Sequence, residues 1–338
     1  MLRVAVLGCG RIGKMHARNI KAHSETSLVA VYDINAKSAA SVAEDCSTQS
    51  IDNIDEIFES DKIDALLVAS STATHADYIE RAVQNGKPVL CEKPIDLSLN
   101  RVNRTAEIIK NTKVQVQLGF NRRFDPGHQA AKKAVVEGKI GDLHQVIITS
   151  RDPEMPPRSY YEDAGGLLRD MTIHDFDLAR FMLDDEPVDV FAVAGGLIDP
   201  ALMNDLGDHD SAMIVMRTED GKQCFINNSR TAVYGYDQRV ELLGTNGMVQ
   251  SNNRKPHEMQ TFSKKASAIS EPYQFFFLER YSESFMAEIS SFVDSIRNDK
   301  PAKVGFEDGR KALILAEAAY ISLEEKRLVK VTEVAERK

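Results

Sequence analysis

The sequence predicts an α/β protein that begins with a doubly wound parallel sheet and continues as an α+β domain with a large, mainly antiparallel, open-faced sheet. Three observations predict this fold. Short apolar strands alternate with helical stretches over the first 120 residues, which is typical of a parallel sheet covered on both faces. A glycine-rich turn follows the first strand and opens the first helix. After residue 121, several strands alternate apolar and polar residues, as in a sheet with one exposed face.

Residues 1–120 are expected to form a dinucleotide-binding domain of the Rossmann type. Its strands are predicted at the apolar runs 3–7, 27–32, 63–69, 89–91 and 114–119. Stretches of helical character separate these strands, at 11–22, 36–45, 75–84 and 99–110. Asn85-Gly86 is a good stop signal for the third of these helices.

Residues 121–338 are expected to form a second domain that binds substrate and carries the oligomer contacts. A helix is predicted at 125–137, and two further helices near the C-terminus at 281–297 and 306–326. Between them, the strands of the open-faced sheet are predicted at 143–150, 188–194, 211–217, 223–230 and 238–243.

Composition excludes several classes of protein. The net charge of −9 argues against a nucleic-acid partner or an anionic membrane surface, because both need an excess of lysine and arginine. The sequence contains no run of about 18 apolar residues that would span a membrane, and the chain enters its first strand at once, unlike a signal peptide. The four cysteines form no CxxC pair, so no metal site is expected and a reducing cytoplasm fits best.

The glycine turn, Gly8-Cys9-Gly10-Arg11-Ile12-Gly13, predicts where a dinucleotide binds. Gly8 permits the tight turn, Gly10 lets the backbone approach a pyrophosphate, and Gly13 lets helix and strand pack closely. The backbone N–H groups of Arg11 and Ile12 would then point at phosphate from the positive end of a helix.

Asp33 closes the second strand, 20 residues after Gly13, where an acidic residue accepts hydrogen bonds from the ribose hydroxyls. A carboxylate there would repel a 2′-phosphate. The following Ile34 and Asn35 include no arginine to neutralise it, and Lys37 is the next cation along the chain. NAD is therefore favoured over NADP.

Two further segments carry candidate chemistry. Cys91-Glu92-Lys93-Pro94 places Lys93 where a buried strand leaves the sheet, which is the edge at which parallel sheets bind ligands, and Pro94 is a candidate for a cis peptide bond. Asp170 and His174 lie four residues apart, so on a helix both would face the same way, with Asp177 extending the stripe.

The chain resembles the glucose–fructose oxidoreductase/inositol dehydrogenase (Gfo/Idh/MocA) family over nearly its whole length. Three segments together carry the resemblance: VAVLGCGRIGKMHA, CEKP and GGLLRDMTIHDFDLARF. The segments GFNRRFDP and SRDP are most similar to its inositol dehydrogenases. The resemblance implies that Lys93 contacts both substrate and cofactor and that Asp170 and His174 lie in the catalytic helix.

Alcohol oxidation needs a proton acceptor, and histidine suits that role near neutral pH. His174 is therefore the expected general base, which Asp170 orients or assists by holding a substrate hydroxyl, while Lys93 hydrogen-bonds the reacting oxygen. The resemblance adds candidates for substrate contact: Arg122, Asp152, and Tyr234 or Tyr236. Thr72 and His75, near the edge where the nicotinamide is expected, and Glu92, beside Lys93, are further candidates near the cofactor.

The expected activity is NAD-dependent oxidation of myo-inositol or a close cyclitol to the 2-keto product, as part of inositol catabolism. Alternatives are oxidation of a pyranose or sugar derivative within the same family, or a non-catalytic NAD(P)-binding regulatory protein. The expected partners are a small-molecule polyol and further copies of the chain, as a dimer or homotetramer, because the open sheet face must be covered.

Overall fold

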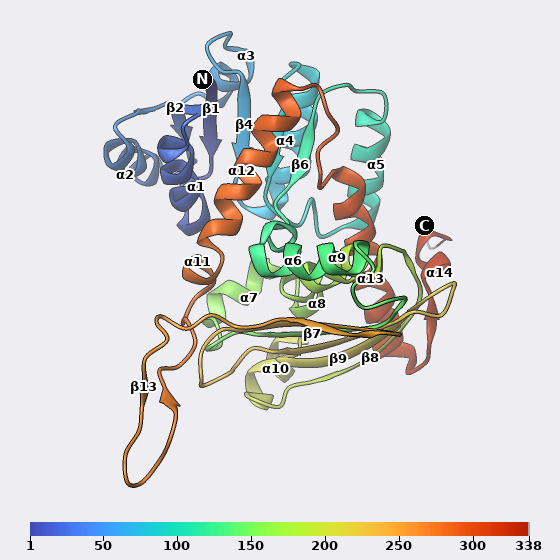
Figure 1. Ribbon diagram of the computed structural model, residues 1–338. Coiled ribbons are helices and arrows are strands. Elements are labelled where there is room, and N and C mark those ends of the chain that lie inside the picture. The colour runs from blue at the N-terminus through green and yellow to red at the C-terminus, as the bar shows by residue number, and fades with distance from the viewer. Residues whose placement is uncertain (337–338) are drawn as a thin grey trace. The chain divides into compact units, whose positions relative to one another are not determined.

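A computed structural model describes residues 1–336, with side chains described as far as Val334. The chain forms two compact units. The first consists of Met1–Phe124 together with Glu283–Leu313, and the second of Asp125–Ser282 together with the described residues from Ile314 onward. Each unit is built around its own sheet (Figure 1).

The sheet of the first unit has six parallel strands in the order β3-β2-β1-β4-β5-β6, which confirms the predicted doubly wound architecture. Its strands are β1 (Leu2–Leu7), β2 (Thr26–Tyr32), β3 (Gln49–Ser50), β4 (Ala65–Val68), β5 (Val89–Cys91) and β6 (Val116–Leu118). The edge strand β3 was not predicted, because two exposed polar residues carry no apolar signal.

Four helices of the first unit alternate with these strands, as predicted: α1 (Arg11–Ala22), α2 (Ala36–Cys46), α4 (Thr72–Gln84) and α5 (Leu99–Ile109). The short helix α3 (Ile54–Glu59) and the 3₁₀ helix η1 (Asn121–Phe124) were not predicted. Asn35 and Ser98 begin α2 and α5 as N-caps, each accepting hydrogen bonds from backbone N–H groups of the first turn.

Helix α12 (Ser282–Arg297) comes late in the chain but packs in the first unit. Ile289, Phe292 and Val293 are buried in one cluster with residues of β1, β4, β5 and α1. The division expected at residue 120 therefore leaves out a helix that the structure places in the first unit. Periodicity shows that such a helix has an apolar face, but not which sheet that face covers.

The sheet of the second unit has seven strands in the order β12-β11-β7-β10-β9-β8-β15, and all of its pairings are antiparallel except that of β7 with β10. Its strands are β7 (Leu143–Arg151), β8 (Pro187–Gly195), β9 (Ser211–Thr218), β10 (Gln223–Ser229), β11 (Asp237–Gly244), β12 (Gly247–Ser251) and β15 (Val329–Lys330). A separate hairpin joins β13 (Gln260–Thr261) and β14 (Ile269–Ser270) and projects from this unit (Figure 1).

The helices of the second unit are α6 (Pro126–Val136), α7 (Arg158–Ala164), α8 (Leu167–Asp170), α9 (Thr172–Leu183), α10 (Pro200–Leu206), α11 (Phe277–Arg280) and α14 (Val331–Glu336). Helix α13 (Phe306–Glu325) begins in the first unit and continues into the second.

The seven-stranded sheet has one covered and one open face, which confirms the predicted pattern. Along β9, Ala212, Ile214 and Met216 are buried, whereas Met213 and Val215 are about half exposed, at 50% and 47%. Helix α9 packs against β7 and β10 on the covered face. Among the described residues, no helix is long and apolar enough to cross a membrane.

Candidate functional site

The glycine turn lies between β1 and α1 and has the shape that a dinucleotide requires. Gly8 has φ +98°, and a Cβ there would lie 2.4 Å from the carbonyl oxygen of Ala69. A Cβ at Gly13 would lie 1.8 Å from the carbonyl oxygen of Gly8, whereas one at Gly10 would meet no atom within 4 Å. Two of the glycines are thus required by the chain itself, and Gly10 leaves an open side where a pyrophosphate fits.

Helix α1 starts at Arg11 behind this open side. Its N-cap is Gly10, which has no side chain to cap the first backbone N–H groups. The first turn of a helix provides N–H donors and the positive end of the helix dipole, so this turn suits a phosphate.

Asp33 is tied to the glycine turn by hydrogen bonds. Its Oδ2 accepts from the backbone N–H of Cys9 at 2.7 Å, and its Oδ1 accepts from that of Asn35 at 2.8 Å. Each carboxylate oxygen has a second lone pair, so Asp33 can also accept from ribose hydroxyls. The turn and Asp33 together fit the adenosine half of NAD.

The lysine turn, residues 92–94, follows β5. The peptide bond between Lys93 and Pro94 is cis, as expected. His75, in the first turns of α4, lies behind it, with Nδ1 2.7 Å from the carbonyl oxygen of Pro94 and Nε2 3.1 Å from that of Ser70. Burial lowers the pKa of His75, so a neutral ring donates its single N–H and anchors the turn. Thr72 begins the same helix and is half-buried.

Glu92 joins the lysine turn to α1. Its Oε1 lies 2.7 Å from Nε2 of His16, which is buried in α1. A Cβ at Gly119 would lie 2.8 Å from Glu92 Oε2, so the glycine leaves room for this carboxylate. The structure therefore gives Glu92 a positioning contact within the first unit.

Asp170 and His174 do not share one uninterrupted helix, which corrects the sequence-based expectation. Asp170 ends α8, His174 lies in the first turn of α9, and Met171 separates the two helices. The N–H of His174 donates to the carbonyl oxygen of Met171 at 3.3 Å, a tighter i to i+3 turn. His174 is half-buried, whereas Asp170 and Asp177 are buried.

Asp170 lies in a charged cluster around Arg230, which the sequence analysis did not single out. Arg230 donates through Nη2 to Asp170 Oδ2 at 2.8 Å and through Nη1 to Asp152 Oδ2 at 3.3 Å. The hydroxyl of Tyr160 donates to Asp170 Oδ1 at 2.8 Å. Two of the predicted site residues, Asp152 and Asp170, are thus brought together by an arginine that is only 3% exposed.

The protonation states of this cluster follow from its contacts. Burial opposes the charge of Arg230, but the attraction of Asp170 and Asp152 outweighs it and raises the pKa of Arg230. Burial and the neighbouring Asp170 carboxylate raise the pKa of Tyr160. Arg230 is therefore a cation and Tyr160 a neutral donor at any physiological pH.

Sheet register explains why Arg230 meets Asp152. Strands β7 and β10 are parallel, and Arg151 pairs with Ser229, so the next residue of each strand lies beside the other. The sequence signal that could have predicted this ion pair is the charged residue directly after each of the two strands. The signal is informative only when the pairing of β7 with β10 is known.

Helix α9 is fixed on the sheet by a buried polar network. The hydroxyl of Thr172 donates to Asn228 Oδ1 at 2.6 Å, and Asn228 Nδ2 donates to Asp175 Oδ2 at 2.9 Å. Asn228 also donates to the backbone of Ser150 at 3.3 Å. These contacts orient the first turn of α9, which carries His174.

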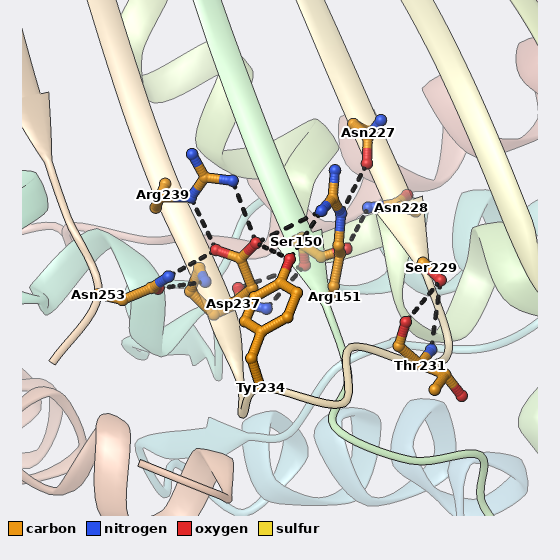
Figure 2. Close-up of polar contacts among 11 residues, drawn as sticks. Ser150, Arg151, Asn227, Asn228, Ser229, Thr231, Tyr234, Asp237, Arg239 and Asn253 are labelled. Atoms are coloured by element: carbon orange, nitrogen blue, oxygen red, sulfur yellow. Dashed lines mark hydrogen bonds and ion pairs between the residues drawn. The ribbon is translucent and has the colours of Figure 1, made fainter. Parts of the chain in front are cut away.

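The remaining substrate candidates, Arg122, Tyr234 and Tyr236, differ in their burial and in their contacts. Arg122 is buried in η1 of the first unit. Tyr234 donates its hydroxyl to Asp237 at 2.7 Å and accepts from Arg151 at 2.8 Å, in a network that extends to Arg239 and Asn253 (Figure 2). Tyr236 is buried and packs edge-on against Tyr281.

Two family models match the chain. One, described as an oxidoreductase family with an NAD-binding Rossmann fold, matches residues 2–120, and the GFO/IDH/MocA C-terminal domain matches residues 128–250. The fold and the glycine turn thus define a dinucleotide-binding oxidoreductase with a second α+β domain. The chain belongs to the GFO/IDH/MocA family.

Known relatives extend over almost the entire chain. The inositol 2-dehydrogenase of Rhizobium meliloti is 43% identical over 332 residues, which cover 98% of this chain and 99% of that protein. A crystal structure of a myo-inositol dehydrogenase from Corynebacterium glutamicum matches with a TM-score of 0.94 and 39% identity, covering 98% of both chains. The scyllo-inositol dehydrogenase of Lactobacillus casei, crystallised with NAD(H) and scyllo-inositol, matches with a TM-score of 0.91 and 29% identity, covering 98% of this chain and 99% of that one.

Proposed function

We propose that this chain oxidises myo-inositol, or a close cyclitol, to the 2-keto product with NAD as hydride acceptor. The observation that carries the proposal is the 43% identity to an inositol 2-dehydrogenase over nearly the full length of both chains. The chain carries the glycine turn, Asp33, Lys93, Asp170 and His174 together, which supports catalysis rather than a purely regulatory role.

The protein's groups have distinct tasks in this reaction. The nicotinamide of bound NAD takes the hydride. His174 accepts the proton of the reacting hydroxyl, directly or through its neighbours, and Lys93 hydrogen-bonds the same oxygen and favours its deprotonation. Asp170, held by Arg230 and Tyr160, holds a substrate hydroxyl or stabilises the charged form of His174.

Substrate contacts are proposed for Arg122, Asp152 and the pair Tyr234 and Tyr236. A cyclitol presents many hydroxyl groups and no charge, so its pocket needs donors and acceptors that are already held in place. Asp152 is held in this way by Arg230. A substrate hydroxyl at Tyr234 would share the phenol with Asp237 and Arg151.

The function is tested by mixing the purified protein with NAD and a panel of polyols and following NADH absorbance. Turnover is expected with myo-inositol or another inositol stereoisomer. Faster turnover of an aldopyranose would favour a sugar dehydrogenase of the same family. No turnover with any cyclitol or aldose would exclude the proposed activity and favour a non-catalytic NAD-binding protein.

Replacing Asp33 by Ala is expected to weaken the preference for NAD over NADP. The substitution removes the acceptor for the ribose hydroxyls and the negative charge that would repel a 2′-phosphate. The measurement is kcat/KM for each cofactor, with Asp55→Ala, an exposed position in the same unit, as control. An unchanged ratio of the two kcat/KM values would mean that Asp33 does not read the ribose.

We further propose that the open sheet face joins two copies of this chain, within a homodimer or homotetramer. Phe191 pairs with Val215 and Val193 with Met213 across β8 and β9, so four exposed apolar side chains form one patch. Sedimentation of the protein should show a dimer or tetramer, and Met213→Asp should shift it to smaller species, while Lys133→Glu on α6 should not. A monomeric parent protein would exclude this interface.

The proposed setting is inositol catabolism in the cytoplasm. Its support is the NAD-linked oxidation itself, the acidic net charge and four cysteines that are buried as free thiols.

A further inference from the structure

Glu288 lies in the middle of α12, with its side chain wholly buried in the first unit. Neither of its carboxyl oxygens has a hydrogen-bond partner among the described residues. An ionised carboxylate in this position would lose its hydration with no donor to replace it. The surroundings therefore favour the protonated acid.

The neighbours of Glu288 are polar but uncharged. Ser284 and Ser291 precede and follow it by four and three residues, so the three side chains form one stripe along α12. The side-chain amide of Gln117 on β6 donates to the backbone oxygen of Glu288 at 3.0 Å. The hydroxyls of both serines and Oε1 of Gln117 are likewise buried, without a partner in the part of the chain that the structure describes. A stripe of this kind suits a protonated acid or internal water.

Glu92, the residue before Lys93, is a charged group near Glu288: it lies beside Gly119, two residues after the Gln117 that contacts the Glu288 backbone. Burial, and then the negative charge of Glu92, raise the pKa of Glu288 well above its usual range. Two histidines also reach α12. His16 of α1 contacts Glu92 and the ring of Phe285, and His23, the residue after α1, contacts Ser290 Oγ at 2.9 Å. Glu92 thus joins the lysine turn to α1 through His16, and the His16 ring continues the contact to α12 at Phe285.

We infer that Glu288 is a positioning residue for the lysine turn, which keeps its proton at neutral pH so that Glu92 faces a neutral acid. If Glu288 ionised, two negative charges would repel each other in a poorly solvated place. Their repulsion would disturb the contact of Glu92 with His16 and, through it, the turn that carries Lys93. The protonated state of Glu288 is inferred from contacts within the first unit alone. Its consequence for turnover rests on the proposed function.

The first test compares the pH dependence of stability. The folded protein keeps a proton on Glu288 that the unfolded chain releases above about pH 4.3, so this group makes the protein less stable as pH rises toward the raised pKa. Glu288→Gln keeps the size and the neutral state but cannot titrate. From about pH 5 upward, the unfolding equilibrium constant of the parent should rise about tenfold per pH unit relative to that of the variant.

Urea unfolding at a series of pH values provides this measurement, at one protein concentration throughout. The control is Glu283→Gln, which makes the same chemical change at an exposed position of the same helix. Its curve should stay parallel to that of the parent. Parallel curves for the parent and Glu288→Gln would overturn the inference.

A second readout does not depend on the folding of one variant. Infrared difference spectra of the parent against Glu288→Leu should contain the carbonyl stretch of a protonated carboxylic acid at neutral pH. The same band should disappear when the parent is titrated to high pH. A parent protein without this band at neutral pH would show that Glu288 is ionised and would overturn the inference.

The catalytic part is tested by kcat as a function of pH. The ratio of kcat for Glu288→Gln to kcat for the parent should rise with pH, because only the parent can place a second charge behind the lysine turn. A ratio that is constant with pH would remove Glu288 from catalysis. Absence of turnover in both proteins would instead contradict the proposed function, and the stability and infrared results would still decide the state of Glu288.

Discussion

Replacing His174 by Ala should lower kcat by about a hundredfold or more, the effect expected for the loss of a general base. His174 is half-buried in the first turn of α9, and the contacts of Thr172 with Asn228 that hold this turn do not involve its ring. The fold should therefore be preserved. NAD should bind with unchanged affinity, since the glycine turn and Asp33 belong to the other compact unit.

The measurements are kcat from NADH absorbance and the Kd of NAD from fluorescence titration. His144→Ala is the matched control, because it removes an exposed histidine from β7 of the same unit. Normal turnover in His174→Ala would remove this residue from the mechanism. Equal losses in both histidine variants would indicate a structural effect.

Replacing Arg230 by Met should destabilise the protein by about 3–5 kcal/mol, the cost of breaking a buried ion pair. Arg230 is the cation between Asp152 and Asp170, and without it both carboxylates lose the attraction of a buried positive charge. The loss of stability should shrink as pH falls, because the ion pairs no longer contribute once the carboxylates are protonated. Turnover should fall as well, because Asp170 loses a contact that orients it.

Urea unfolding at constant protein concentration measures this effect, and Arg217→Met is the control. Arg217 also pairs with a buried aspartate, Asp189, but it is half exposed and Asp189 keeps a second cation, Lys330. The control should therefore change stability by about 1 kcal/mol or less. Adding Asp152→Asn to Arg230→Met should recover part of the stability. An Arg230→Met variant as stable as the control would contradict the role given to Arg230.

Local sequence signals predicted much of the first unit. Helix α1 was predicted at its observed bounds because the glycine turn sets its start, and the strand before Lys93 because a short apolar run ends in charged residues. The cis bond before Pro94 was expected from the same segment. These features depend on residues that are close in sequence, so local patterns are sufficient to find them.

Features that depend on distant residues were missed or described differently. The single helix expected over Asp170 and His174 is divided at Met171. The backbone forms a tighter i to i+3 turn there, where α9 begins to contact the sheet. Arg230 looked like an ordinary residue at a strand end until the parallel pairing of β7 with β10 placed it beside Asp152. Glu288 carried no motif, and only its burial opposite Glu92 distinguishes it from the other acidic residues of α12.

By itself, the sequence determined the two sheet types, the dinucleotide turn, the preference for NAD expected from Asp33, and the residues proposed for the chemistry. It could do so because glycine spacing, strand periodicity and charged residues at strand ends act over a few residues. Only the tertiary structure decided which side chains meet, such as Arg230 with Asp152 and Asp170, and Glu92 with His16. It also decided that α12 packs on the first sheet. The free energy of a buried charged group depends on its desolvation and on its partners. Both depend on residues brought together from distant parts of the chain.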